Sequence, residues 1–189
     1  MAFLSQADIE KMGFRHVGRE VKLSDRASFH NAGALEIGDF SRIDDFCVLS
    51  AGKQGIKIGR NVHIAVYTSL VGAEQILLED FCNLSSRVSV YSSNDDYSGA
   101  FMTNPTVASQ FTGVTHAPVT IGRHAIIGSG SIVLPGVTIG EGAAVGALSL
   151  ANRDCDAFVM YAGVPAKAIG QRRRDLLQHE RDFLASERR

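Results

Sequence analysis

Histidine is the side chain best suited to move protons at neutral pH, because its ordinary pKa lies at about 6.5. The chain has six histidines, so proton transfer is the first chemistry to consider. Three of them fall near the chain ends or in its least regular part: His16, His30 and His179. Of those in the middle, we prefer His63 as a general base and keep His116 and His124 as alternatives.

Two adjacent carboxylates, Asp95 and Asp96, lie in a long polar segment. An ordinary aspartate is too weak a base, by several pKa units, to deprotonate a hydroxyl group. A carboxylate can instead orient an imidazole and stabilise its cation. We therefore assign Asp95 or Asp96 a supporting role beside the histidine.

The elements that must position these side chains follow from a six-residue repeat. Aliphatic residues recur at this spacing in the C-terminal half, and a small or β-branched residue follows each of them four positions later. A strict period of six fits neither an α-helix nor a long alternating strand, and it indicates a parallel β-helix. The aliphatic series is Ile121, Ile127, Val133, Ile139 and Val145.

The same spacing runs back through the chain with interruptions. The predicted inward positions are Leu23, Phe29, Ile37, Ile43, Leu49, Ile58, Ile64, Leu70, Leu78, Leu84 and Val90. A longer break, at residues 92–118, is polar and rich in turn formers, and a loop of this length inside a compact domain is usually functional. We expect an all-β-dominated chain whose single domain, residues 21–169, holds about six coils.

The two ends depart from the repeat. Residues 1–20 contain a short predicted helix, capped by Ser5 and ended by Gly13. Residues 170–189 are rich in helix formers, and we expect this helix to cover the open end of the coil stack, because solenoids need polar caps.

Composition limits the classes of function. The chain has 189 residues, 45% of them hydrophobic, and a formal net charge of −1, so nucleic acid is not an expected partner. Charged residues interrupt the apolar run at 119–150, and no stable membrane insertion is expected. The N-terminal sequence MAFLSQADIE lacks the features of a signal peptide, and three widely spaced cysteines suit buried thiols, so we predict a cytoplasmic protein.

The hexapeptide pattern followed by AGVPAK, residues 162–167, resembles the hexapeptide-repeat acyltransferases, and more narrowly their galactoside and maltose O-acetyltransferase branch. The resemblance covers roughly residues 38–172. It implies a left-handed β-helix and a homotrimer with active sites in grooves between subunits. It also implies transfer of an acetyl group from acetyl-CoA to a hydroxyl group, or less often an amino group, of a sugar in surface-polysaccharide or O-antigen synthesis.

The donor half of the implied site carries over well. The resemblance places the pantetheine arm of acetyl-CoA along Ser129 and Ala147, where a bulky side chain would fill the channel. A family arginine falls on Gly170, so the nearby Arg172 is assigned to its place. The full set of implied phosphate contacts is Asn152, Arg153, Lys167 and Arg172, since phosphate needs a nearby cation.

The acceptor half departs from the family pattern. The His-Pro pair that supplies the family's base is replaced by Asp95 and Asp96. The family's acceptor-binding asparagine and aspartate align with Ala65 and Ala73. An alanine side chain has no polar group with which to bind an acceptor. The base must therefore lie elsewhere in this chain.

His63 fits that role because it directly precedes the inward-facing Ile64, so strand alternation turns its side chain outward. Asn83 occupies the equivalent position one coil later and is a predicted hydrogen-bonding neighbour. Tyr97, in the loop, could stack on a sugar ring.

Two other classes remain open. A zinc enzyme resembling the γ-carbonic anhydrases would gather His63, His116 and His124 around a metal, although nothing in the sequence fixes such ligands in tetrahedral geometry; we expect no metal. A non-catalytic trimeric scaffold would explain the lost His-Pro pair, but it needs no donor channel.

Overall fold

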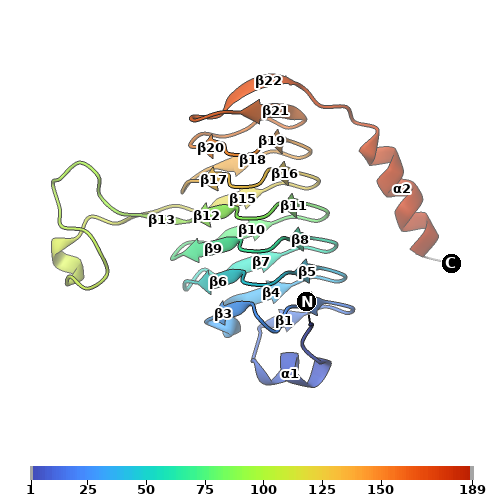
Figure 1. Cartoon of the computed structure of the whole chain (residues 1–189), viewed down its shortest axis with the longest axis horizontal. Helices are drawn as coiled ribbons and strands as arrows, with labels where there is room; N and C mark the ends of the chain where they lie inside the picture. Colours follow the sequence, from blue (N-terminus) through green and yellow to red (C-terminus); the bar gives the residue numbers. More distant parts are fainter. Residues whose placement is uncertain (1, 188–189) are drawn as a thin grey trace.

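The computed structural model describes residues 2–187 and shows a β-solenoid in which three short strands make each turn (Figure 1). Strands at the same place in successive turns pair in parallel, so three sheets run the length of the stack. The second sheet holds seven such strands within the described residues, and the solenoid therefore has about seven turns rather than the six expected. The last turn departs from the repeat, because Tyr161 pairs in register with Val145 after 16 positions instead of after three hexads.

The bounds of the strands, sheet by sheet, are as follows. The first sheet contains β1 (His16–Val17), β4 (Leu35–Ile37), β7 (Ile56–Ile58), β10 (Ile76–Leu78), β15 (Val119–Ile121) and β18 (Thr138–Ile139). The second sheet contains β2 (Lys22–Leu23), β5 (Arg42–Ile43), β8 (His63–Ile64), β11 (Asn83–Leu84), β16 (Ile126–Ile127), β19 (Ala144–Val145), β21 (Val159–Ala162) and the antiparallel β22 (Lys167–Gln171). The third sheet contains β3 (Ser28–His30), β6 (Val48–Ala51), β9 (Ser69–Gly72), β12 (Ser89–Tyr91), β17 (Ile132–Val133) and β20 (Leu150–Ala151).

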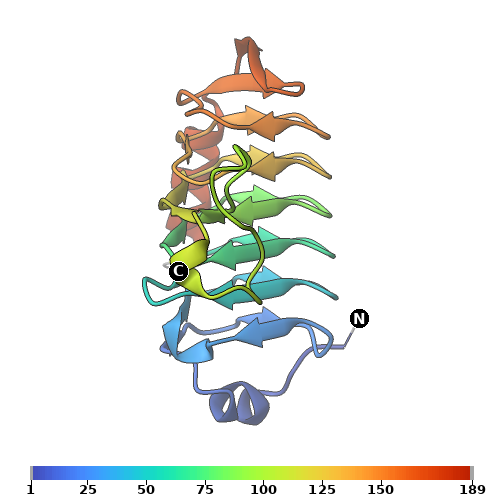
Figure 2. The same cartoon turned by 90° about the vertical axis from the view of Figure 1, so that its left-hand side faces the viewer.

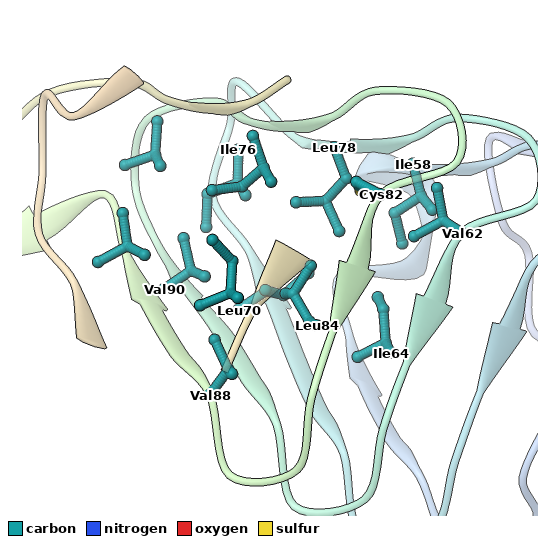
Figure 3. Close-up of a cluster of buried hydrophobic side chains, with 14 of the residues drawn as sticks. Ile58, Val62, Ile64, Leu70, Ile76, Leu78, Cys82, Leu84, Val88 and Val90 are labelled. Atoms are coloured by element: carbon teal, nitrogen blue, oxygen red, sulfur yellow. The ribbon is translucent and has the colours of Figure 1, made fainter. Parts of the chain in front are cut away.

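The core is the column of aliphatic side chains inside the coils (Figure 3). Ile64 pairs in register with Leu84, which pairs with Ile127, and all three are fully buried. Each such side chain contributes about 1.5–3 kcal/mol by leaving water, which explains why the period of six is kept. The predicted inward positions are confirmed. Phe29 pairs in register with the buried Leu49 and packs against the core, but it is only partly buried and meets Phe14 edge-on.

The solenoid has three corners. The first corner joins the first sheet to the second, the second corner joins the second to the third, and the third corner joins the third to the first. At the second corner Phe46 and Tyr67 adopt left-handed backbone conformations, with φ of 60° and 63°, and their rings stack at 5.0 Å. Stacking offsets the cost of about 1–2 kcal/mol that this backbone region imposes on a side chain.

The predicted loop at 92–118 is confirmed. It leaves the third corner through an antiparallel pair, β13 (Ser93–Asn94) and β14 (Thr115–His116), and contains the short 3-10 helix η2 (Ser109–Phe111). Figures 1 and 2 show that it projects away from the stack rather than closing over the coil that it leaves. Its residues are therefore presented on the outside of the molecule.

The N-terminal end is closed by α1 (Gln6–Lys11), whose cap Ser5 accepts a hydrogen bond from the Asp8 N–H and whose Ile9 is buried. A second 3-10 turn, η1 (Ala32–Ala34), lies in an early coil.

The expected position of the C-terminal helix is wrong. The helix α2 (Leu176–Glu187) lies along the first corner, and the antiparallel β22 lies over the last coil instead (Figure 1). The reason is that α2 has specific partners on the side of the stack, where Phe183 meets Phe81 edge-on at 6.1 Å.

The three cysteines are free and buried, as expected of core thiols. Burial raises the pKa of Cys47 and of Cys155 to about 11, so both stay protonated at neutral pH. Among residues 2–187, none of the helices has the length and apolar character needed to cross a membrane. The left hand of the coil and the homotrimer stay predictions of the family resemblance.

Candidate active site

A polar cluster centred on His63 lies on the outer face of the second sheet. Its Nε2 lies 3.0 Å from Oδ2 of Asp44, and its Nδ1 lies 3.0 Å from Oδ1 of Asn83. The outward direction of His63 and its contact with Asn83 agree with the prediction from strand alternation. The imidazole is 42% exposed, so a substrate could reach it.

Asp44 is the buried member of this cluster, with a side chain only 7% exposed. The guanidinium of Arg42 donates a hydrogen bond of 2.6 Å from Nε to the second carboxylate oxygen, Oδ1. Burial alone would raise the pKa of Asp44, but the hydrogen bonds from His63 and Arg42 outweigh it and hold the pKa below its ordinary value. Asp44 is therefore an anion at neutral pH.

Sequence reasoning missed Asp44 and assigned its role to Asp95 or Asp96. The available signal was the coil register: Arg42 pairs with His63 and Ile43 with Ile64, so the residue after Ile43 stands at the corner one coil below Ala65, within reach of the His63 ring. The structure places Asp44 beside the imidazole, and it places both loop aspartates in other surroundings.

Asp96 organises its own loop. Its carboxylate accepts hydrogen bonds from the N–H groups of Ser98, Gly99 and Phe101 at 3.0–3.2 Å, and from the Ser98 hydroxyl at 2.7 Å. The Ser98 hydroxyl is the main reason why the pKa of Asp96 lies below its usual value. The oxygens of Asp96 are thus already in use.

Asp95 lies at a cavity of about 480 Å³ between the loop and the third sheet. Apolar residues line part of the cavity, including Val71 and Val114, and Asn104 and Thr112 add an amide and a hydroxyl. The carboxylate of Asp95 is exposed and so can meet a ligand.

Two further predicted site residues of the loop, His116 and Tyr97, lie in different surroundings. His116 lies at the base of the loop, with Nδ1 at 2.8 Å from Oγ of Ser93. Tyr97 is 87% exposed and projects to solvent.

Two of the residues assigned to the donor lie at the second corner, toward the C-terminal end of the stack. Ser129 and Ala147 are exposed and belong to adjacent coils, since the Leu148 N–H donates a hydrogen bond of 2.9 Å to the Ser129 carbonyl. Their small side chains leave this edge open. Three of the residues assigned to the phosphates are also exposed at this end of the stack: Asn152 and Arg153 follow β20 at the third corner, and Lys167 begins β22.

The structure keeps Arg172 and His124 away from this edge. Arg172 donates from Nη1 to the carbonyls of His124 and Gly142, at 3.0 and 2.9 Å, and burial lowers the pKa of its guanidinium. His124 lies at the first corner, stacked on Phe81, with Nε2 at 2.9 Å from Oε2 of Glu180. Burial, followed by the neighbouring Arg123, lowers the pKa of His124.

The three histidines that the zinc hypothesis requires do not lie close together. His63 lies on the second sheet, His116 at the third corner and His124 at the first. Within residues 2–187, no group of three or more histidine, cysteine, aspartate or glutamate side chains has a geometry that could hold a metal ion.

Known proteins provide an independent comparison. Residues 118–150 match the family model of the bacterial transferase hexapeptide (six repeats). The chain is 50% identical over 186 residues to the dTDP-4-amino-4,6-dideoxy-D-glucose acyltransferase of Escherichia coli, covering 98% of this chain and 97% of that protein. The galactoside O-acetyltransferase of Escherichia coli is 44% identical, but over only 52 residues and 28% of this chain.

Solved structures give the same grouping. The N-acyltransferase AntD from Bacillus cereus is 43% identical with a TM-score of 0.94, and a variant of it was solved with dTDP-4-amino-4,6-dideoxyglucose and coenzyme A, covering 97% of both chains. Another AntD structure, with the same identity and TM-score, contains dTDP and 3-hydroxybutyryl-CoA and covers 99% of this chain and 98% of that one.

These matches show that the predicted O-acetyltransferase activity is wrong. The similarity to the galactoside enzyme is confined to a short stretch, whereas the relatives that align along the whole chain acylate an amino sugar. The hexads and AGVPAK carry features that O- and N-acyltransferases share, so they could not separate the two. The discriminating signal was the altered acceptor half, where Ala65 and Ala73 replace the acceptor-binding residues.

Proposed function

The chain belongs to the hexapeptide-repeat acyltransferases, and we propose that it is an N-acyltransferase that moves an acyl group from an acyl-CoA to the amino group of dTDP-4-amino-4,6-dideoxyglucose. The observation that carries this proposal is the match of the whole chain, at 50% and 43% identity, to an acyltransferase named for that amino sugar and to AntD solved with it. The similarity includes the loop at 92–118 as well as the coils, because it covers 97–98% of the chain.

The donor would lie along the second corner. The pantetheine arm passes Ser129 and Ala147, and the exposed Arg153 and Lys167 meet the phosphates, because charge-assisted contacts to phosphate need cations at this end. The acyl group is acetyl, as the family resemblance suggests, or a longer group such as the 3-hydroxybutyryl group bound by AntD.

The acceptor would meet the loop. The AntD variants include substitutions of one serine and one aspartate that are ten positions apart in that chain. The pairs Ser85–Asp95 and Ser86–Asp96 have the same spacing here. Because Asp96 is saturated by its own loop, Asp95 is the aspartate free to attract the ammonium form of the amino sugar.

This assignment favours a homotrimer. Ser85, Ser129 and Ala147 lie at the second corner, whereas the loop bearing Asp95 projects from the third (Figure 2). A site that uses both is completed when the loop of one subunit reaches the second corner of the next, and repetition of that contact closes a ring. A nucleotide sugar as acceptor also fits the cytoplasmic supply of units for a surface polysaccharide.

Direct transfer is the mechanism we assign. The bound ammonium ion first loses one proton to solvent. The amine nitrogen then attacks the thioester carbon while His63 removes a second proton, and a backbone N–H stabilises the oxyanion. The C–S bond then breaks, its electron pair goes to sulfur, and the thiolate takes the proton from His63. The products are an amide and free coenzyme A.

The decisive experiment offers the purified protein two donors and two matched acceptors. Acetyl-CoA and 3-hydroxybutyryl-CoA are each tested with dTDP-4-amino-4,6-dideoxyglucose and with dTDP-6-deoxyglucose, which carries a hydroxyl group at the same carbon. Thiol release and product mass should show transfer to the amine alone. Transfer to the hydroxyl sugar, or no transfer to either acceptor with either donor, would contradict the proposal.

A further inference from the structure

The cluster around His63 raises the question of which nitrogen of the ring can act. Both ring nitrogens face side-chain oxygens, with Asp44 on Nε2 and Asn83 on Nδ1, each at 3.0 Å. These two partners are chemically different. A carboxylate only accepts hydrogen bonds, whereas an amide offers an oxygen on one side and an NH₂ group on the other.

The carboxylate decides the tautomer. Asp44 is buried, Arg42 is bonded to one of its oxygens, and the other oxygen faces the ring, so Nε2 of His63 must carry a hydrogen. In the neutral ring the hydrogen-free nitrogen is therefore Nδ1. Asn83 suits both states of that atom, because its NH₂ can donate to a bare Nδ1 and its oxygen can accept from a protonated one.

We propose that Asp44 is the positioning residue of this enzyme: it holds His63 in the Nε2–H form, so that Nδ1 takes the proton from the attacking amine. The incoming amine replaces Asn83 as the partner of Nδ1. This inference rests on the proposed function for its substrate, but the tautomer that it assigns does not depend on any substrate.

The neighbours of the cluster agree with this role. Asp44 stands at the corner position that Ala65 and Ser85 occupy in the next two coils. Ala65 has no polar side-chain atom, so it does not compete with His63 for the carboxylate of Asp44. A carboxylate next to a ring that must become cationic also stabilises the imidazolium at the moment of transfer.

The first test does not depend on catalytic activity of the protein. Long-range ¹⁵N–¹H NMR of the intact protein, compared with His63→Gln to assign the signal, should show His63 as the Nε2–H tautomer. In Asp44→Asn the amide no longer imposes that form, so the two nitrogen shifts should move toward an averaged pair. A dominant Nδ1–H form in the unaltered protein would overturn the proposal, even if the variant failed to fold.

The second test is kinetic. Asp44→Asn should lower kcat by about 10²-fold, close to the loss in His63→Gln, with little change in KM for the acyl-CoA and with an altered pH profile of kcat. The double variant should lose no more than His63→Gln alone, because the two residues act as one unit. Asp44→Glu keeps a carboxylate and should restore part of the rate.

Asp45→Asn is the matched control, since Asp45 is the next residue at the same corner and its carboxylate bonds the Ser24 hydroxyl instead. It should keep its kcat. An unchanged kcat and pH profile in Asp44→Asn would overturn the proposal while leaving the proposed function intact. If the unaltered protein showed the Nε2–H tautomer but no turnover of the amino sugar, the proposed function would fail and the tautomer assignment would stand.

Discussion

The Glu180 carboxylate on the C-terminal helix lies 2.9 Å from Nε2 of His124, a residue 56 positions earlier at the first corner of the solenoid. The other oxygen of Glu180 pairs with Arg123, and the glutamate side chain is only 7% exposed. At the end of the helix, Glu187 pairs with Arg60 at 2.6 Å. The helix thus fastens several coils together along the side of the stack.

Glu180→Gln should destabilise the protein. The change leaves Arg123 without its buried partner and weakens the contact to His124, and removing one member of a buried polar pair costs about 1–3 kcal/mol. The melting temperature should fall by roughly 2–4 °C for each kcal/mol. Asp182→Asn, at an exposed position of the same helix, is the control, and equal losses in both variants would argue against the specific contact.

Asp44→Asn should change how stability depends on pH. The folded pKa of Asp44 lies below its ordinary value of 3.8, so its contribution is complete above that value and is lost as the pH falls through the lower, folded pKa. The gap in melting temperature between the unaltered protein and the variant should therefore be widest near neutral pH and narrow in acid. Asp25→Asn, at an exposed position one coil below, should show a small gap at every pH; a pH-independent gap for Asp44→Asn would contradict the assignment.

The sequence predicted the structure best at positions where the geometry of the coil allows only one type of residue. Ile64 and Leu84 had to be apolar to stack inside the coils, so the period of six predicted the core and, by alternation, the outward direction of His63. The contact of Asp44 with that ring joins residues 19 positions apart in neighbouring coils, so it follows only from the register between coils, which the interruptions of the repeat obscure. The place of α2 likewise depended on Glu180 finding Arg123, a pairing that composition cannot reveal.

The two loop aspartates should behave differently when they are made neutral. Asp95→Asn removes an exposed charge at the loop cavity, so it should raise KM for the amino sugar or lower kcat by about tenfold or more, with little change in melting temperature. Asp96→Asn replaces one of the two oxygens that accept backbone N–H bonds with an NH₂ donor, so it should loosen the loop, as increased proteolysis between residues 96 and 113 would report. If Asp95→Asn kept full activity, Asp95 would have no part in acceptor binding.

Donor binding should depend on the open edge at the second corner. Ala147→Trp places an indole where Ser129 and Ala147 now leave room, and Lys167→Glu reverses the charge at the phosphate end, so both should remove the thermal stabilisation produced by acyl-CoA. In the unaltered protein, a ligand present at 100 times its Kd should stabilise the fold by about 2.7 kcal/mol.

Lys11→Glu, on α1 at the opposite end of the solenoid, carries the same charge reversal and should keep the full thermal shift with acyl-CoA. Because neither tested position contacts the core, both variants should fold normally without ligand, so a lost shift would report the donor site itself. If both variants kept the full thermal shift with acyl-CoA, the coenzyme would have to bind on another face of the solenoid.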